Sequence, residues 1–209
     1  MKERPILFSA PMVRAILEDR KTQTRRVVNP QPEREPSEQN GAWYPSTTSK
    51  KKRHYADESH FRRGLPLDWS PYGATGDRLW VRETWAKHYC GLPGTHFKPH
   101  YRAELPDDHD AAMTANHAFG LMKWMSPIHM PRWASRITLE VVNVLVERLQ
   151  QISEQDAKAE GVESVAEYAA LWDSINGVGS WAENPWVWVV EFRAVPADLR
   201  VRQVPGGAA

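Results

Sequence analysis

The chain has 209 residues, 41% of them hydrophobic and 25% charged, a composition typical of a globular domain. Its formal net charge of +1 at pH 7 excludes a global field that would attract nucleic acid and leaves only local basic patches for that role. The single cysteine, Cys90, excludes an intrachain disulfide and a cysteine metal cluster. No apolar run resembles a signal peptide or the roughly 20 residues of a membrane helix, so we expect a cytoplasmic protein without a membrane partner.

The N-terminal segment predicts a strand, a helix and a second strand. Residues 5–9 favour a short strand. Ser9 can cap a helix that carries Pro11 in its first turn, and this helix should end near Asp19. The β-branched residues of "TRRVV", 24–28, favour the next strand.

A cationic stretch, "EDRKTQTRR", lies between that helix and the second strand. Its positive charges are Arg20, Lys21, Arg25 and Arg26. A solvated charged turn is one interpretation. A site for an anionic or polar ligand is the other.

Regular patterning is interrupted in three places. Residues 29–71 are predicted to form a long insertion or loop, with four consecutive cations at 50–53, and not a second domain. Residues 106–123 predict a second loop, and 196–209 a flexible tail.

The stretch "RLWVRETW", 78–85, predicts a strand. Period-2 alternation places Glu83 on the same face as Leu79 and Val81. A carboxylate does not suit an apolar face. We therefore expect Glu83 either to lie at the strand end or to point into a polar cavity.

The C-terminal third carries the clearest signals. The stretch "ASRITLEVVNVLVERL", 134–149, is the best strand in the chain, and Ser153 with Asp156 has the spacing of a capping box for a helix that stops at Gly161. A second helix should begin after Ser164 and bury an apolar face made of Val165, Ala169, Trp172 and Ile175. The stretch 184–195 predicts a closing strand. Many short strands with few βαβ units favour an α+β fold built on a small barrel.

Several of these stretches together resemble the ASCH domain of the PUA-like superfamily, in its longer phage and prophage form. They are "ILEDRKTQTRR", "GDRLWVRETWA", "SPIHMPRWASRITLEV", "SRITLEVVNVLVERLQQISEQDAKAEGV" and "NPWVWVVEF". The resemblance implies a PUA-like small mixed β-barrel with flanking short helices, formed as a single domain by residues 1–195. It also implies a cleft for RNA or a modified nucleoside.

Some small bacterial ASCH proteins are amidohydrolases that deacetylate N4-acetylcytidine with a Lys, a Thr and a Glu. The resemblance carries these roles to Lys21, Thr24 and Glu160. It implies a metal-independent hydrolase of a non-peptide C–N bond in N4-acylated cytidine or a related nucleoside, without a cofactor.

Two role assignments are compatible with these three residues. Lys21 acts as the base while Glu160 orients it, or Lys21 stays cationic and stabilises the oxyanion while Glu160 takes the proton. Neighbouring arginines and burial would lower the pKa of Lys21, and Glu160 would raise it. A structural ion pair between the two is the alternative without catalysis. For Lys21 and Thr24 to converge, we expect irregular backbone at 20–23.

Other residues are weaker candidates for substrate binding. They are Arg26, Arg82, Glu83, His129, Arg132 and Trp133. No histidine pair has metal-ligand spacing, so we expect no metal site. The alternative function is an RNA- or modified-nucleic-acid-binding module, with ribonuclease as a third possibility that no clear acid–base pair supports.

Overall fold

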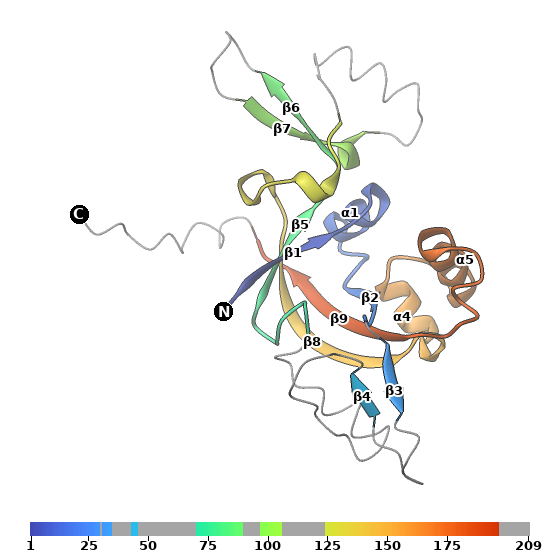
Figure 1. Cartoon of the computed structure of the whole chain (residues 1–209). Helices are drawn as coiled ribbons and strands as arrows, with labels where there is room; N and C mark the ends of the chain where they lie inside the picture. Colours follow the sequence, from blue (N-terminus) through green and yellow to red (C-terminus); the bar gives the residue numbers. More distant parts are fainter. Residues whose placement is uncertain (30, 35–42, 46–69, 90–96, 106–123, 197–209) are drawn as a thin grey trace. The chain divides into compact units, whose positions relative to one another are not determined.

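The computed structural model describes residues 1–29, 31–34, 43–45, 70–89, 97–105 and 124–196 (Figure 1). The strands in these residues are β1 (Glu3–Leu7), β2 (Gln23–Val27), β3 (Pro32–Arg34), β4 (Trp43–Pro45), β5 (Arg78–Arg82), β6 (Trp85–Tyr89), β7 (Phe97–Tyr101), β8 (Thr138–Arg148) and β9 (Trp186–Ala194). The α-helices are α1 (Ala10–Leu17), α4 (Glu154–Ala159) and α5 (Val165–Asn176). Short 3-10 helices are η2 (Arg102–Glu104), η3 (Pro127–His129), η4 (Arg132–Ala134) and η5 (Leu149–Gln151).

The largest sheet has five strands in the order β1-β5-β8-β9-β2. It is mixed, because β1 pairs with β5 in parallel whereas β5 pairs with β8, and β2 with β9, antiparallel. Two hairpin sheets, β3-β4 and β6-β7, accompany it. The predicted α+β class is confirmed. The strand order is linear, and the described residues form no closed barrel.

The chain divides into two compact units. The first contains residues 1–19, 78–140 and 194–209, and the second contains 20–77 and 141–193. β8 and β9 contribute residues to both units. The organisation of 1–195 as one ASCH domain stays a prediction.

In the first unit, α1 begins after Ser9 as predicted but ends at Leu17, slightly before Asp19. It buries Val13 and Ile16. The stretch 78–85 is not one strand, because β5 stops at Arg82 and β6 starts at Trp85. Glu83 therefore lies just beyond the strand end, the first of the two predicted alternatives. The segment around Tyr101 forms β7, which pairs with β6.

The second unit contains α4 and α5, which lie beside β2 and β9 (Figure 1). Apolar side chains of both helices, of η5, of the residue that follows η5 and of β9 form one core cluster: Leu149, Ile152, Ala157, Tyr168, Trp172, Val187 and Val189. The predicted apolar face of α5 is wrong at Ile175, which is 54% exposed. The i, i+4 pair Tyr168 and Trp172 makes the buried stripe, and Ile175 lies in the last turn, outside the cluster.

Most of the predicted 29–71 insertion, the 106–123 loop, Cys90 and nearly all of the predicted tail lie outside the described residues. No helix in the described part of the chain combines the length and the apolar character needed to cross a membrane.

Candidate functional site

The cationic stretch caps the C-terminus of α4. After α1, Asp19 adopts a left-handed conformation with φ 56° and turns the chain, and residues 20–22 are irregular before β2 starts at Gln23. The predicted irregular backbone is thus confirmed for 20–22. The last carbonyls of a helix lack intrahelical donors. Here Thr22 N donates to Ala159 O at 2.8 Å, and Arg20 Nη1 reaches Gly161 O at 3.5 Å.

Both ends of α4 follow the sequence signals. The predicted capping box is confirmed, since Ser153 Oγ accepts from Asp156 N at 3.1 Å and Asp156 Oδ2 accepts from Ser153 N at 3.0 Å. Gly161 has φ 92°, and the amides of Gly161 and Val162 close the helix on Lys158 O and Ala157 O. Glu160 is consequently held at the C-cap.

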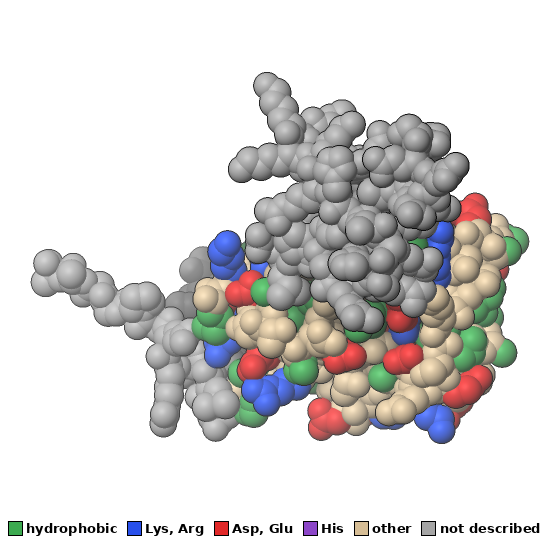
Figure 2. All heavy atoms as spheres, turned by 90° about the horizontal axis from the view of Figure 1, so that it is seen from below, with side chains coloured by type: hydrophobic (Ala, Val, Ile, Leu, Met, Phe, Trp, Pro, Cys, Tyr) green, Lys and Arg blue, Asp and Glu red, His purple; other side chains and the backbone are tan. Residues whose placement is uncertain are grey.

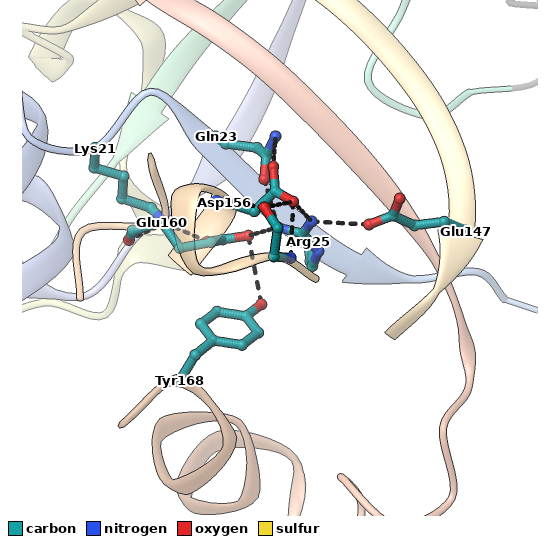
Figure 3. Close-up of polar contacts among 8 residues, drawn as sticks. Lys21, Gln23, Arg25, Glu147, Asp156, Glu160 and Tyr168 are labelled. Atoms are coloured by element: carbon teal, nitrogen blue, oxygen red, sulfur yellow. Dashed lines mark hydrogen bonds and ion pairs between the residues drawn. The ribbon is translucent and has the colours of Figure 1, made fainter. Parts of the chain in front are cut away.

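Lys21 and Glu160, separated by 139 residues in sequence, form a buried ion pair (Figure 3). Lys21 Nζ lies 2.6 Å from Glu160 Oε2 and also donates to the Glu160 carbonyl at 2.7 Å. The two side chains are 0% and 2% exposed. The ammonium therefore has both a carboxylate and a helix C-terminus as acceptors, away from bulk solvent.

Arg25 is the second cation of this site. Its Nη1 lies 3.4 Å from Glu160 Oε1, and its Nη2 lies 2.8 Å from Glu147 Oε1 and 3.4 Å from Asp156 Oδ2. Nη1 also donates to Gln23 Oε1. Figure 3 shows Arg25 on β2 between Glu147 of β8 and the carboxylates of α4. The guanidinium thus ties β2, β8 and α4 together.

Tyr168 of α5 completes the contacts of Glu160. Its hydroxyl donates to Glu160 Oε1 at 3.4 Å (Figure 3). Burial raises the pKa of Tyr168 far above its ordinary value, and the Glu160 charge adds to this. Tyr168 therefore remains a neutral hydrogen-bond donor at physiological pH.

Opposing effects act on the pKa of Lys21. Burial lowers it, Glu160 raises it, and the charges of Arg26 and Arg25 lower it again, with a net decrease. At the rim of the site, burial raises the pKa of Asp156, but hydrogen bonds from Ser153 and the Arg25 charge act against burial and bring the pKa below its ordinary value. The surroundings of Lys21 thus favour its neutral form more than water does, and the surroundings of Asp156 favour its ionised form.

Thr24 and Arg26 leave β2 on the face opposite to Gln23 and Arg25, because side chains alternate along a strand. Thr24 is buried and lies opposite Val190 in the β2–β9 register, whereas Arg26 is half-buried and lies opposite Trp188. Of the three residues to which the resemblance gives catalytic roles, Lys21 and Glu160 are in direct contact, and Thr24 lies three positions further along the chain in the same unit.

The remaining predicted site residues belong to the first unit. Glu83 is buried and binds Arg136 in a fork, with Nε–Oε1 at 2.9 Å and Nη2–Oε2 at 3.0 Å. Arg136 also contacts Glu104 and stacks 4.0 Å from the Tyr101 ring centroid. Burial raises the pKa of Glu83, and Arg136 counteracts it in part. Glu83 is thus part of an ion-pair cluster of the first unit that also contains Arg136 and Glu104.

Arg132 and Trp133 lie in η4, and Arg82 of β5 contacts the neighbouring helix η3. The Arg82 guanidinium lies 4.6 Å from the ring centroid of Trp80, and its Nη1 donates to Ile128 O at 3.2 Å. Arg132 pairs with Glu3 at 2.9 Å. Trp133 is 56% exposed and meets Trp85 edge-on. His129 is exposed at the end of η3.

Sequence reasoning missed Arg25 as the organising cation, together with its partners Gln23, Glu147, Asp156 and Tyr168. One signal was available: β2 alternation puts Gln23 and Arg25 on one face, and Asp156 and Glu160 share a helix face at i, i+4. No local pattern indicates that these two faces meet. Arg136, the partner of Glu83, was missed for the same reason.

In the described part of the chain, no three histidine, cysteine or carboxylate side chains gather where they could hold a metal ion. No protein-family model, curated protein or solved structure matches the chain. The second unit offers a buried lysine in direct contact with a buried carboxylate. Such a pair can accept a proton from a nucleophile or stabilise an oxyanion.

Proposed function

We propose that this protein is an ASCH-type amidohydrolase of the PUA-like barrel class that removes the acyl group from N4-acylated cytidine or a related modified nucleoside. The observation that carries the proposal is the 2.6 Å contact between Lys21 Nζ and Glu160 Oε2. These are two of the three residues to which the sequence resemblance gives catalytic roles. The lowered pKa of Lys21 supports its assignment as the base, oriented by Glu160.

The reaction proceeds in two steps. Thr24 Oγ attacks the acyl carbon while Lys21 takes the hydroxyl proton, and the C–N bond breaks as that proton passes to the leaving amine. Water then hydrolyses the threonine ester, which releases the carboxylic acid and restores Thr24. Lys21 and Glu160 are almost fully buried, so the proposed reaction requires a route by which the acyl group reaches them.

The test is release of cytidine from N4-acetylcytidine, followed by chromatography. Wild type should turn over, and Lys21→Ala, Thr24→Ala and Glu160→Gln should each lose at least about a hundredfold in kcat/KM. The controls Lys158→Met and Glu163→Gln change exposed residues of the same unit and should retain full activity. No turnover by wild type, or equal turnover by Lys21→Ala, would remove the proposal.

A second candidate, binding of single-stranded nucleic acid, is favoured by the exposed surface of η3 and η4. Trp133 offers a half-open ring next to Arg132, a combination suited to stacking on a base beside a phosphate. Trp133→Ala should weaken binding of a fluorescent RNA oligonucleotide about tenfold, while Trp181→Ala in the second unit leaves it unchanged. Equal affinities of wild type and Trp133→Ala would exclude this surface.

A further inference from the structure

The two oxygens of the Glu160 carboxylate have different partners. Oε2 faces Lys21 at 2.6 Å, whereas Oε1 faces Arg25 Nη1 and the Tyr168 hydroxyl, each at 3.4 Å. Arg25 and Tyr168 therefore orient the carboxylate through Oε1, the oxygen that does not face Lys21. Rotation of the carboxylate would break contacts to both Arg25 and Tyr168.

Arg25 is itself immobilised from three elements. Glu147 reaches it from β8, Asp156 from the first turn of α4, and Gln23 from β2. Gln23 Nε2 further donates to Asp156 Oδ1 at 3.3 Å. Gln23 therefore contacts both the Arg25 guanidinium and the Asp156 carboxylate. The Arg25 side chain is 1% exposed. The Arg25 guanidinium therefore has acceptors from β8, α4 and β2 around it.

The charges explain why a second cation matters. If Lys21 gave up its proton with no other cation present, the buried Glu160 carboxylate would be left without a compensating charge, which is strongly unfavourable. Arg25 remains beside Glu160 in that state. It also repels the ammonium form of Lys21.

We propose that Arg25 is a positioning residue of the Lys21–Glu160 pair, which holds Glu160 toward Lys21 and compensates the carboxylate when Lys21 is neutral. This role rests on the proposed hydrolase function, in which Lys21 must accept a proton. Arg25 acts through Glu160 and has no contact with the reacting atoms in this scheme.

The test follows the titration of Lys21 directly, by NMR of protein labelled at lysine Cε and Nζ, with Lys21→Met to assign the resonance. Arg25→Met should move the titration midpoint of Lys21 about one pH unit higher, and Arg25→Lys should move it less. Arg193→Met removes an exposed arginine of the same unit and should leave the midpoint unchanged. If Arg25→Met does not fold, Arg25→Gln/Glu147→Gln removes both charges together and should still raise the midpoint.

An unchanged or lower midpoint in the folded Arg25 variants overturns the positioning role. The readout needs no substrate, so it separates the two proposals. A raised midpoint with no deacylation by wild type leaves the electrostatic role of Arg25 intact and removes the hydrolase. Where wild type is active, the acid limb of its kcat/KM profile should move with the NMR midpoint in Arg25→Lys, and a limb that stays in place counts against Arg25.

Discussion

At the scale of single residues, Lys21 and Glu160 form an ion pair whose two side chains are almost fully buried. Each charge is therefore compensated mainly by its partner and not by water. Removing one member of a buried pair leaves a charge that water cannot solvate. Arg25 and Tyr168 still contact Glu160 when Lys21 is absent, which gives the carboxylate partial compensation. The ion pair therefore contributes to the fold whether or not it also carries chemistry.

We expect Lys21→Met to lower the free energy of unfolding by about 3 to 5 kcal/mol. The double variant Lys21→Met/Glu160→Gln should lose less than the sum of the two single variants, because the unpaired charge is removed. Urea denaturation followed by tryptophan fluorescence measures both values. Strict additivity of the two substitutions would show that the side chains are not coupled.

At the scale of elements, side chains join strands to helices inside each unit. In the second unit, Arg25 connects β2 with β8 and α4. In the first unit, the Tyr101 hydroxyl of β7 donates to Ala134 O of η4 at 2.9 Å, beside the Glu83–Arg136 fork. Each such contact joins a strand to another element of the same unit.

The Tyr101 contact predicts an alkaline pH dependence of stability. Burial raises the pKa of Tyr101 from 10.0 to about 12, with Arg136 opposing and Glu83 and Glu104 adding to it. The unfolded chain thus loses this proton first, so the stability contributed by Tyr101 is complete below pH 10 and is lost toward pH 12. Tyr101→Phe should cost about 1 kcal/mol at pH 7.

Chemical denaturation of wild type and Tyr101→Phe at several pH values between 8 and 12 tests this expectation. The difference between the two proteins should shrink above pH 10. Tyr72 and Tyr168, whose pKa values burial also raises, are present in both proteins, so their contributions cancel in the difference. A difference that stays constant to pH 12 would show that the Tyr101 hydroxyl is not stabilised in its protonated form.

At the scale of the whole molecule, positive and negative charges nearly cancel. The net charge is +1, and acidic and basic side chains lie interspersed on the described residues in the view of Figure 2. Any affinity for nucleic acid must then come from a few clustered cations. The run of four at 50–53 is the densest such cluster in the sequence, and it lies outside the described residues.

If this run binds phosphates, replacing its four cations by glutamine should reduce the salt dependence of RNA binding. For single strands each neutralised phosphate contributes about 0.7 to the slope of log K against log salt, so the slope should fall by about 3. Fluorescence anisotropy over a salt series measures it. An unchanged slope would assign any binding to other residues, Trp133 and Arg132 among them.

Local signals in the sequence predicted most elements of the fold. Ser153 with Asp156 and Gly161 define α4 because caps act within one turn of the helix. Alternating β-branched residues define β8, and "TRRVV" defines most of β2. At Glu83 the local pattern admitted two outcomes and the tertiary structure decided between them, whereas at Ile175 the predicted burial is wrong. Whether a sheet closes into a barrel likewise depends on long-range strand pairing, which period-2 patterning does not specify.

The sequence by itself determined the helices α1, α4 and α5, the strands β1, β2, β8 and β9, and the cationic stretch, and its resemblance to ASCH proteins singled out Lys21, Thr24 and Glu160. Only the tertiary structure decided that Lys21 meets Glu160 at 2.6 Å, that solvent is excluded there, and that Arg25 shares the carboxylate. The physical reason is that protonation depends on burial and on neighbouring charges, and both arise when segments 139 residues apart pack together.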